Sequence, residues 1–226
     1  MNVQLETITP NAEVNIVKIA RVSSPRKDKT EKPEKLIKYL IDHKHWSPFQ
    51  HAYMTVGITT SKAISIQILR HLSFTFQEFS QRYATVPGWE PFVLRLQAES
   101  NRQSSTVECD PKVHFNMYID DVNNIDTGFL EGLPASQIIE AYINAGFDLY
   151  NKLLAAGVAR ESARFVLPLC TSTDLYVTGS IRSWIHYLAI RDDEHTQLEH
   201  QLIAQEIKEI FIKELPLVSK ALGYIE

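Results

Sequence analysis

The sequence is poor in cysteine and in the motifs that cysteine usually builds. Its 226 residues contain two cysteines, Cys109 and Cys170, which lie far apart in the chain. Two distant cysteines form neither a disulfide framework nor a C-x-x-C metal or redox motif. This scarcity is typical of proteins of the reducing cytoplasm, and we expect a cytoplasmic location.

Long apolar runs and an excess of basic charge are also missing. No run of about 18 apolar residues occurs, so we expect no membrane-spanning helix. The first residues, MNVQLE, lack the basic and then apolar regions of a signal peptide. The formal net charge of −4 argues against a nucleic-acid polymer or a membrane surface as a partner.

The common nucleotide and metal motifs are absent as well. The chain contains neither G-x-G-x-x-G nor G-x-x-x-x-G-K-[ST], which argues against a Rossmann or P-loop site. Its eight histidines include no H-E-x-x-H pair, so we expect no metal site. No internal repeat, low-complexity tract or linker stands out, and we expect a single domain over residues 1–226.

Predicted strands and helices are mixed along the chain without a regular βαβ alternation. This order favours an α+β fold, with a mixed or antiparallel sheet and several long helices. Asn11, Ser61 and Ser136 precede helical patterns and are expected to cap them, and Ser180 opens another helix. Residues 23–33 and 45–51 are predicted loops, and residues 113–124 fit either a strand or a helix. The predicted strands are 3–9, 52–60, 92–97 and 175–178, and the predicted helices are 12–20, 34–43, 62–72, 137–156, 160–166, 180–191 and 196–213.

Residues 70–83 form the most informative stretch, RHLSFTFQEFSQRY, which mixes charged and amide side chains with aromatics. A surface loop does not need so many aromatics, and a plain core does not accept so many groups that require hydrogen-bond partners. Guanidinium groups bind phosphate, amides read base edges, and apolar walls exclude water. The stretch therefore indicates a site for a planar, phosphorylated molecule.

Polar residues near this stretch have helical or close spacing. Gln67, Arg70 and His71 stand at i, i+3 and i+4 and would share one helix face. A solvated face is the alternative, but the apolar residues around them favour burial. Ser80 and Arg82 fit a phosphate-binding role. Ser80 as a nucleophile is less favoured, because no activating base has an obvious spacing around it.

A second basic group, Arg160, Arg164, Arg182 and Arg191, lies in the C-terminal half. Arg164 could simply pair with Glu161 three residues earlier. Arg182 shares a helix side with His186, whereas Arg191 lies roughly 900° further along, almost opposite. Either the helix ends early, or its two faces serve two neighbouring sites, which implies an oligomer.

These residues resemble the signatures of the flavin-dependent thymidylate synthases. The family pattern R-H-R, seven residues, then S-x-R matches residues 70–82, with Leu72 in place of the third residue. The loop H-x-x-P-F-E-H matches residues 45–51, with Gln50 in place of Glu. R-E-x-A-R-x-V-L-P matches residues 160–168. The helix of residues 180–195 is similar to N-x-R-x-x-x-N/H-F-L-x-L-R-x-x-x-x-A/H, with Ser180 in place of Asn. Residues 20–23 also fit, and the resemblance covers most of the chain apart from roughly 97–135.

The resemblance implies a reaction and a set of ligands. Members methylate dUMP to dTMP, with 5,10-methylenetetrahydrofolate as carbon donor and FAD, reduced by NADPH, as hydride source. They are α+β homotetramers with flavin sites between subunits. Arg191 matches the residue that activates the uracil by favouring ionisation at N3, and His45 is expected near flavin and folate. The expected dUMP-binding residues are Gln67, Arg70, Glu78, Phe79, Ser80, Gln81, Arg82, Arg164 and Arg191. The expected FAD-binding residues are Ser47, Arg70, His71, Leu72, Glu78, Ser180, Arg182 and His186.

Two other functions use the same residues. A flavin- or nucleotide-dependent oxidoreductase without methyl transfer would need the same pocket, but it would make no dTMP. A non-catalytic nucleotide-binding or regulatory protein would need the phosphate-binding cations but no flavin. Leu72 removes a family cation beside FAD, so the resemblance also predicts weaker flavin binding in this chain.

Overall fold

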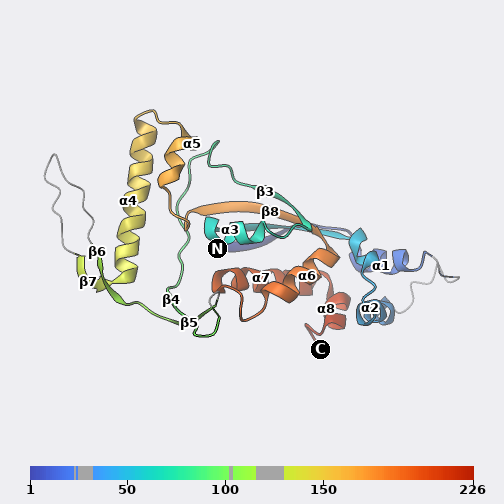
Figure 1. Cartoon of the computed structure of the whole chain (residues 1–226). Coiled ribbons are helices and arrows are strands. Elements are labelled where there is room, and N and C mark those ends of the chain that lie inside the picture. The colour runs from blue at the N-terminus through green and yellow to red at the C-terminus, as the bar shows by residue number, and fades with distance from the viewer. Residues whose placement is uncertain (23, 25–32, 102–103, 116–129) are drawn as a thin grey trace. The chain divides into compact units, whose positions relative to one another are not determined.

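The computed structural model describes residues 1–22, 24, 33–101, 104–115 and 130–226. They form two compact units, the first of residues 1–79 and 172–226 and the second of residues 80–171 (Figure 1). Most of the predicted loop 23–33, and residues 116–124 of the ambiguous segment, lie outside the described residues. The expectation of one domain over the whole chain stays a prediction.

A four-stranded antiparallel sheet organises the first unit, in the order β1-β2-β8-β3. β1 lies at the edge, as its alternating pattern predicts, and the α+β class is confirmed. β3 was not predicted from the sequence, and the predicted strand 175–178 is shorter than β8. β8 pairs on both sides, with β2 over nine residues and with β3 over five, and this pairing extends it through polar positions. The strands are β1 (Asn2–Ile8), β2 (Tyr53–Ser61), β3 (Phe74–Glu78) and β8 (Ser172–Ser180).

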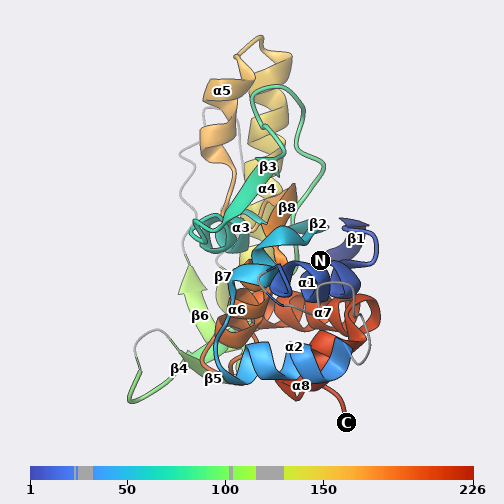
Figure 2. The same cartoon turned by 90° about the vertical axis from the view of Figure 1, so that its right-hand side faces the viewer.

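Helices of the first unit cover one face of this sheet, and α1, α6 and α7 lie on that side in Figure 2. Alternate residues of the central strands, among them Val56 and Val177, enter the core with Trp184. The Trp184 indole packs edge-on against Phe74 at 4.6 Å and donates to the carbonyl of Met54 at 2.9 Å. The helices are α1 (Ala12–Ala20), α2 (Pro33–Asp42), η1 (Ser47–His51), α3 (Lys62–Ile68), α6 (Ile181–Arg191), α7 (Leu198–Glu214) and α8 (Pro216–Leu222).

One of the three predicted helix caps, that of Ser61, is confirmed, and Ser180 forms a cap that was not predicted. The Ser61 hydroxyl accepts from the backbone N–H of Ile64, and that of Ser180 accepts from Ser183, so α3 and α6 each begin at a serine that ends a strand. Asn11 precedes α1 in a left-handed conformation and makes no side-chain cap. Ser136 lies inside α4 and bonds instead to the Asp110 carboxylate through its N–H and hydroxyl.

Three further elements of the first unit, α3, η1 and α8, differ from the prediction. α3 ends at Ile68, because the chain must turn there to enter β3, so Arg70 and His71 lie in a turn instead of on the helix. Backbone bonds from His71 to Ile68 and from Phe74 to His71 close this turn. The predicted loop 45–51 contains the 3₁₀ helix η1, and the sequence analysis missed α8.

The second unit contains two small antiparallel sheets and a long helix. Gly157, with a φ of 85°, follows the end of α4, as predicted for a helix-terminating glycine. The predicted strand 92–97 is confined to β4, and the predicted helix 160–166 is divided into α5 and a 3₁₀ turn. The elements are β4 (Arg95–Gln97), β5 (Ser105–Glu108), β6 (Lys112–Phe115), β7 (Leu130–Pro134), α4 (Ala135–Ala155), α5 (Arg160–Ala163) and η2 (Arg164–Val166).

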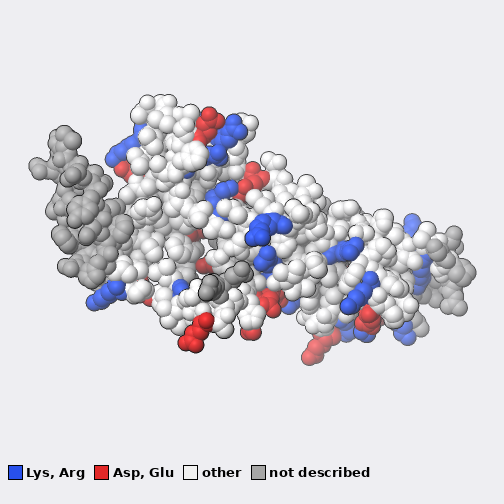
Figure 3. All heavy atoms as spheres, viewed as in Figure 1, with Lys and Arg blue, Asp and Glu red and all other residues white. Residues whose placement is uncertain are grey.

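Charges of both signs are interspersed on the face that Figure 3 presents. This distribution agrees with the small net charge of −4. Among the described residues, every helix is too short or too polar to cross a bilayer.

The contact between β8 and β3 predicts a stability effect at Gly179. A Cβ at this position would collide with the Phe74 ring, which packs on Trp184. Gly179→Ala should therefore lower the free energy of unfolding by about 1–3 kcal/mol, measured by urea denaturation. Gly88→Ala is the control, because a Cβ at Gly88 meets open space. Equal stability of the two variants would contradict the packing argument.

Candidate active site

A hydrogen bond joins the end of α6 to the turn before β3. The Arg191 Nε donates to Nε2 of His71 at 2.9 Å. Arginine can only donate, so Nε2 of His71 accepts and the ring carries its hydrogen on Nδ1. Burial lowers the His71 pKa to about 4, with further lowering by Arg191, His186 and Arg70. His71 is therefore neutral at neutral pH, and the bond leaves the two terminal amino groups of Arg191 available to a ligand.

A buried polar cluster lies beside this pair. The His71 ring is edge-on to Tyr187 at 5.0 Å and lies 6.4 Å from the His200 ring. His200 bonds to the Tyr187 hydroxyl through Nε2 and to the side-chain oxygen of Gln67 through Nδ1, each at 3.1 Å. Burial lowers the His200 pKa to about 3 and raises that of Tyr187, so both groups stay neutral. The cluster brings Gln67 and His71, which are four residues apart, together with Arg191, which stands far from both in the sequence.

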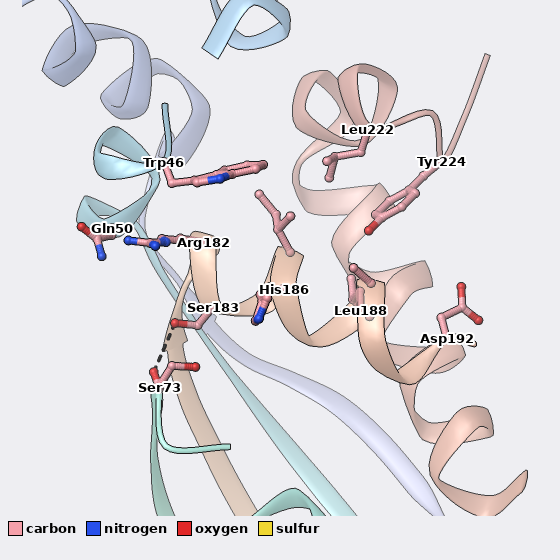
Figure 4. Close-up of a pocket in the computed structure, with 12 residues that line it drawn as sticks. Trp46, Gln50, Ser73, Arg182, Ser183, His186, Leu188, Asp192, Leu222 and Tyr224 are labelled. Atoms are coloured by element: carbon pink, nitrogen blue, oxygen red, sulfur yellow. Dashed lines mark hydrogen bonds between the residues drawn. The ribbon is translucent and has the colours of Figure 1, made fainter. Parts of the chain in front are cut away.

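A cavity of about 810 Å³ runs along the opposite side of α6. Arg182 and His186 line it, whereas Arg191 turns to His71, so the prediction that α6 presents Arg182 and Arg191 on different faces is confirmed. Trp46 and Arg182 lie on one side of the cavity, with Leu222 and Tyr224 across from them (Figure 4). Only part of this lining was predicted from the sequence. The helical spacing from Arg182 could have found Ser183, Ile185, Ala189 and Asp192, but no sequence signal indicated Trp46, Ser73, Leu188, Leu222 or Tyr224.

The two ends of the cavity differ in charge. Arg182 stands at the first turn of α6 and Asp192 directly after the last. The Asp192 carboxylate pairs with Lys208 at 2.7 Å, and the Lys208 ammonium lies 4.6 Å from the centre of the Tyr224 ring. Burial raises the Tyr224 pKa, and the nearby Asp192 charge raises it further. One end of the cavity therefore offers a cation, Arg182, for which the described residues provide no ion-pair partner. The other end has the Asp192 carboxylate, whose charge is neutralised by Lys208.

Glu78 ends β3 and is held from two sides. Its carboxylate pairs with the Lys62 ammonium at 2.9 Å and accepts from the Thr173 hydroxyl at 3.2 Å. Phe79 continues the ladder through its N–H, which donates to the carbonyl of Asp174. Both residues belong to the sheet of the first unit, and the Glu78 carboxylate is fixed before any ligand binds.

Ser80, Gln81, Arg82 and Arg164 lie in the second unit. The Arg82 guanidinium pairs with the Glu161 carboxylate at 3.4 Å, and Arg164 Nε donates to the Glu161 carbonyl at 3.4 Å. Arg82 and Arg164 therefore meet at one residue, although the ion pair of Glu161 forms with Arg82 instead of with Arg164. The Ser80 hydroxyl accepts from the backbone N–H of Arg82 at 3.4 Å, which closes a turn.

The remaining predicted residues lie in the first unit with different surroundings. The Ser180 side chain is buried and already caps α6, whereas Ser47 is exposed at the start of η1. The exposed His45 ring lies 5.8 Å from Tyr39. Leu72 is 93% exposed, so no apolar pocket has formed around it. Among the described residues, no group of three or more His, Cys, Asp or Glu is arranged to hold a metal ion.

Comparison with known proteins identifies the family. Residues 4–217 match the model of the thymidylate synthase complementing protein family. The chain belongs to this family. It is 44% identical over 216 residues to a probable flavin-dependent thymidylate synthase of Paramecium bursaria Chlorella virus 1, covering 95% of this chain and 92% of that protein. It is 42% identical over 207 residues to the flavin-dependent thymidylate synthase of Synechocystis sp., covering 91% and 86%.

A solved structure supports the same family. The crystal structure of the UMP/dUMP methylase PolB from Streptomyces cacaoi, bound with 5-Br dUMP, matches with a TM-score of 0.76 at 26% identity. The match covers 99% of this chain and 95% of that one. The resemblance of the sequence to the flavin-dependent thymidylate synthases is thereby confirmed.

The two neutral histidines predict a pH dependence of stability. Their folded pKa values, about 4 and about 3, lie below the ordinary 6.5, so between these limits the unfolded chain binds more protons. The free energy of unfolding therefore rises with pH in this window. The contribution of the two histidines to stability is present above pH 6.5 and is lost as the pH falls toward their folded pKa values. His200→Gln should reduce the slope by up to about 1.4 kcal/mol per pH unit in urea denaturation. His43→Gln, at an exposed ring, is the control, and an unchanged slope in His200→Gln would contradict the assignment.

Proposed function

We propose that the protein catalyses the reductive methylation of dUMP to dTMP, with 5,10-methylenetetrahydrofolate as carbon donor and FAD, reduced by NADPH, as hydride source. Family membership and the match to a UMP/dUMP methylase support this reaction. The arrangement of Arg191 carries the proposal within the structure. Its guanidinium is oriented by neutral His71 and keeps its terminal amino groups for a ligand.

The role proposed for Arg191 is electrostatic. A fixed cation beside the uracil stabilises negative charge that develops on the ring, and it favours loss of the N3 proton. The hydrogen bond to His71 keeps the guanidinium in place before the substrate arrives, so little reorganisation is needed during the reaction. Because His71 is neutral, it does not neutralise the charge of Arg191, and its Nδ1–H is available to a second acceptor.

The cavity along α6 fits a flavin nucleotide. Its volume of about 810 Å³ lies within the range of roughly 300–1,000 Å³ of ligand pockets. Arg182 offers a cation to the phosphates, and Trp46 and Leu222 offer apolar walls to a planar ring. The flavin supplies the hydride chemistry when bound, and the protein supplies orientation and electrostatics. Ser180 would act through the position of α6, because its own hydroxyl serves as the helix cap.

Arg82 and Arg164 are proposed to hold the nucleotide phosphate. Both guanidinium groups gather at Glu161, and the Arg82 pair is exposed, so a phosphate can replace this weak partner. Ser80 adds a hydroxyl beside the same turn. We assign Ser80 to binding, since its hydroxyl contacts a backbone N–H and no described base.

The resemblance also supports a homotetramer with flavin sites between subunits, and the scarcity of cysteine supports a cytoplasmic location. An FAD-dependent oxidoreductase without methyl transfer remains the alternative. Incubation with dUMP, 5,10-methylenetetrahydrofolate, NADPH and FAD separates the two. Formation of dTMP supports the proposed reaction, whereas NADPH oxidation without dTMP supports the alternative.

Substitution of Arg191 tests its proposed role. Arg191→Ala should slow dTMP formation by about 10²–10³-fold while the bound flavin spectrum persists, since the variant removes a charged donor at a developing anion. Rapid-quench analysis of dTMP gives the rate, and flavin absorbance gives the occupancy. Lys18→Ala, on α1, is a control for loss of a surface cation. If Arg191→Ala forms dTMP at nearly the wild-type rate, the proposed electrostatic role of Arg191 is wrong.

Leu72 predicts weakened flavin binding. An arginine at this exposed position would add a charge-assisted contact worth roughly 1.5–3 kcal/mol, or about 10- to 150-fold in affinity. The wild-type protein should therefore purify with partial flavin, and Leu72→Arg should tighten FAD binding in a fluorescence titration. Leu72→Gln, which is polar but uncharged, is the matched control. Full FAD occupancy in the wild type, together with no gain in Leu72→Arg, would contradict the prediction.

A further inference from the structure

Five side chains form a continuous line of hydrogen bonds beside the Arg191–His71 pair. Gln67 Nε2 donates to Gln197 Oε1 at 2.6 Å, and Gln197 Nε2 donates to Glu199 Oε2 at 2.9 Å. Gln67 Oε1 in turn contacts His200, which contacts the Tyr187 hydroxyl. We refer to Tyr187, His200, Gln67, Gln197 and Glu199 as the polar chain.

The carboxylate at one end sets the direction of the polar chain. A carboxylate only accepts hydrogen bonds, so Gln197 must turn its amide nitrogen toward Glu199 and its amide oxygen toward Gln67. Gln67 must then present its nitrogen to Gln197, which leaves its oxygen facing His200. The reversed arrangement would place the Gln197 oxygen against the Glu199 carboxylate, where no hydrogen is available.

The tyrosine at the other end can donate or accept, and in this direction it donates. The Gln67 oxygen has no hydrogen, so Nδ1 of His200 must donate to it and Nε2 must accept from the Tyr187 hydroxyl. Burial keeps His200 neutral, as this arrangement requires. Tyr187 is 2% and His200 0% exposed, so water does not compete for these groups. The Glu199 carboxylate therefore sets the orientation of the Gln67 amide, and the buried His200 and Tyr187 complete the polar chain in that orientation.

This orientation determines what Gln67 can offer a ligand. The amide oxygen is occupied by His200, and one of the two amide hydrogens is occupied by Gln197. Within the described residues, the second hydrogen has no recorded partner. Gln67 therefore presents a donor. Gln67 also lies close to the Arg191–His71 pair. It contacts His200, and the centre of the His200 ring lies 6.4 Å from that of His71, which accepts from Arg191.

We propose that the polar chain makes the enzyme select a nucleobase with a carbonyl oxygen, as in uracil, over one with an amino group at that place, as in cytosine. A donor on Gln67 bonds to the uracil oxygen but opposes the cytosine amino group. Gln67 contacts the base, and Tyr187, His200, Gln197 and Glu199 are positioning residues. The inference rests on the proposed function in placing Gln67 in the nucleotide site.

Two substitutions change the hydrogen bonds at opposite ends of the polar chain, those of Tyr187 and of Glu199. Tyr187→Phe removes the hydroxyl that donates to Nε2 of His200, and Glu199→Gln gives the far end a hydrogen to donate. Either change allows the Gln67 amide to turn and accept from cytosine. Equilibrium dialysis of the full-length protein with dUMP and with dCMP measures both affinities without turnover. We expect the wild type to prefer dUMP and each variant to reduce this preference about 2- to 12-fold, mainly through tighter dCMP binding.

Tyr150→Phe provides the matched control. It deletes a hydroxyl from a fully buried tyrosine of α4 that has no described hydrogen-bond partner, so the chemical change equals that in Tyr187→Phe. The preference for dUMP should be unchanged in this variant. Equal weakening of both nucleotides in Tyr187→Phe and Glu199→Gln, or a preference that stays at the wild-type value, would overturn the inference.

A direct measurement decides the matter if the variants fail to fold. ¹⁵N NMR of the histidine-labelled wild type should show His200 neutral with its hydrogen on Nδ1, assigned by the signal lost in His200→Gln. A hydrogen on Nε2 would overturn the inference. The proposed function fails separately. Absence of dTMP, with dUMP still preferred over dCMP, would reject the reaction and retain the selectivity, whereas dTMP formation without that preference would reject the selectivity alone.

Discussion

The antiparallel pairing of β2 with β8 is the constraint on which the candidate site of the first unit depends. The two strands pair over nine residues, from Tyr53 opposite Ser180 to Ser61 opposite Ser172. Each strand ends in a serine that caps the next helix, so α3 and α6 leave opposite ends of the same ladder. The backbone bonds and the apolar residues between them stabilise this arrangement together. The positions of Gln67 and Arg191 follow from it.

The turn between α3 and β3 completes the arrangement. Because α3 stops at Ile68, the chain returns to pair β3 with β8 and carries His71 to the last turn of α6. Arg191 and His71 then fix one another, the cation by position and the imidazole by protonation state. One hydrogen bond thus serves both residues. It orients the Arg191 guanidinium, and the nearby Arg191 charge helps to keep His71 neutral.

Local features of this fold could be predicted from the sequence, and long-range ones could not. The faces of α6 follow from 100° per residue, and the Ser61 and Ser180 caps follow from residue type at a helix start. Asn11 and Ser136 have the same residue preferences but other backbone conformations or partners, which composition does not reveal. The family pattern supplied the candidate residues of the site.

The contacts among these residues needed coordinates. His71 and Arg191 are far apart in the sequence, and nothing in the local pattern of either indicates their hydrogen bond. The participation of Leu222 and Tyr224 in the cavity depends on how α8 and the residues after it pack on α6 and α7, and no short motif records that packing. The early end of α3 was missed for the same reason, because pairing with β8 decides it.

Both faces of α6 are in use, so the spacing along this helix is itself a constraint. Arg182 faces the cavity and Arg191 faces His71, nine residues further on. Inserting or deleting one residue between them would turn one face relative to the other by about 100° and would move both sites out of register at once. Substitutions within the helix can be absorbed one at a time, but its length cannot change. Evolution in this segment is therefore expected to proceed by replacement and not by insertion or deletion.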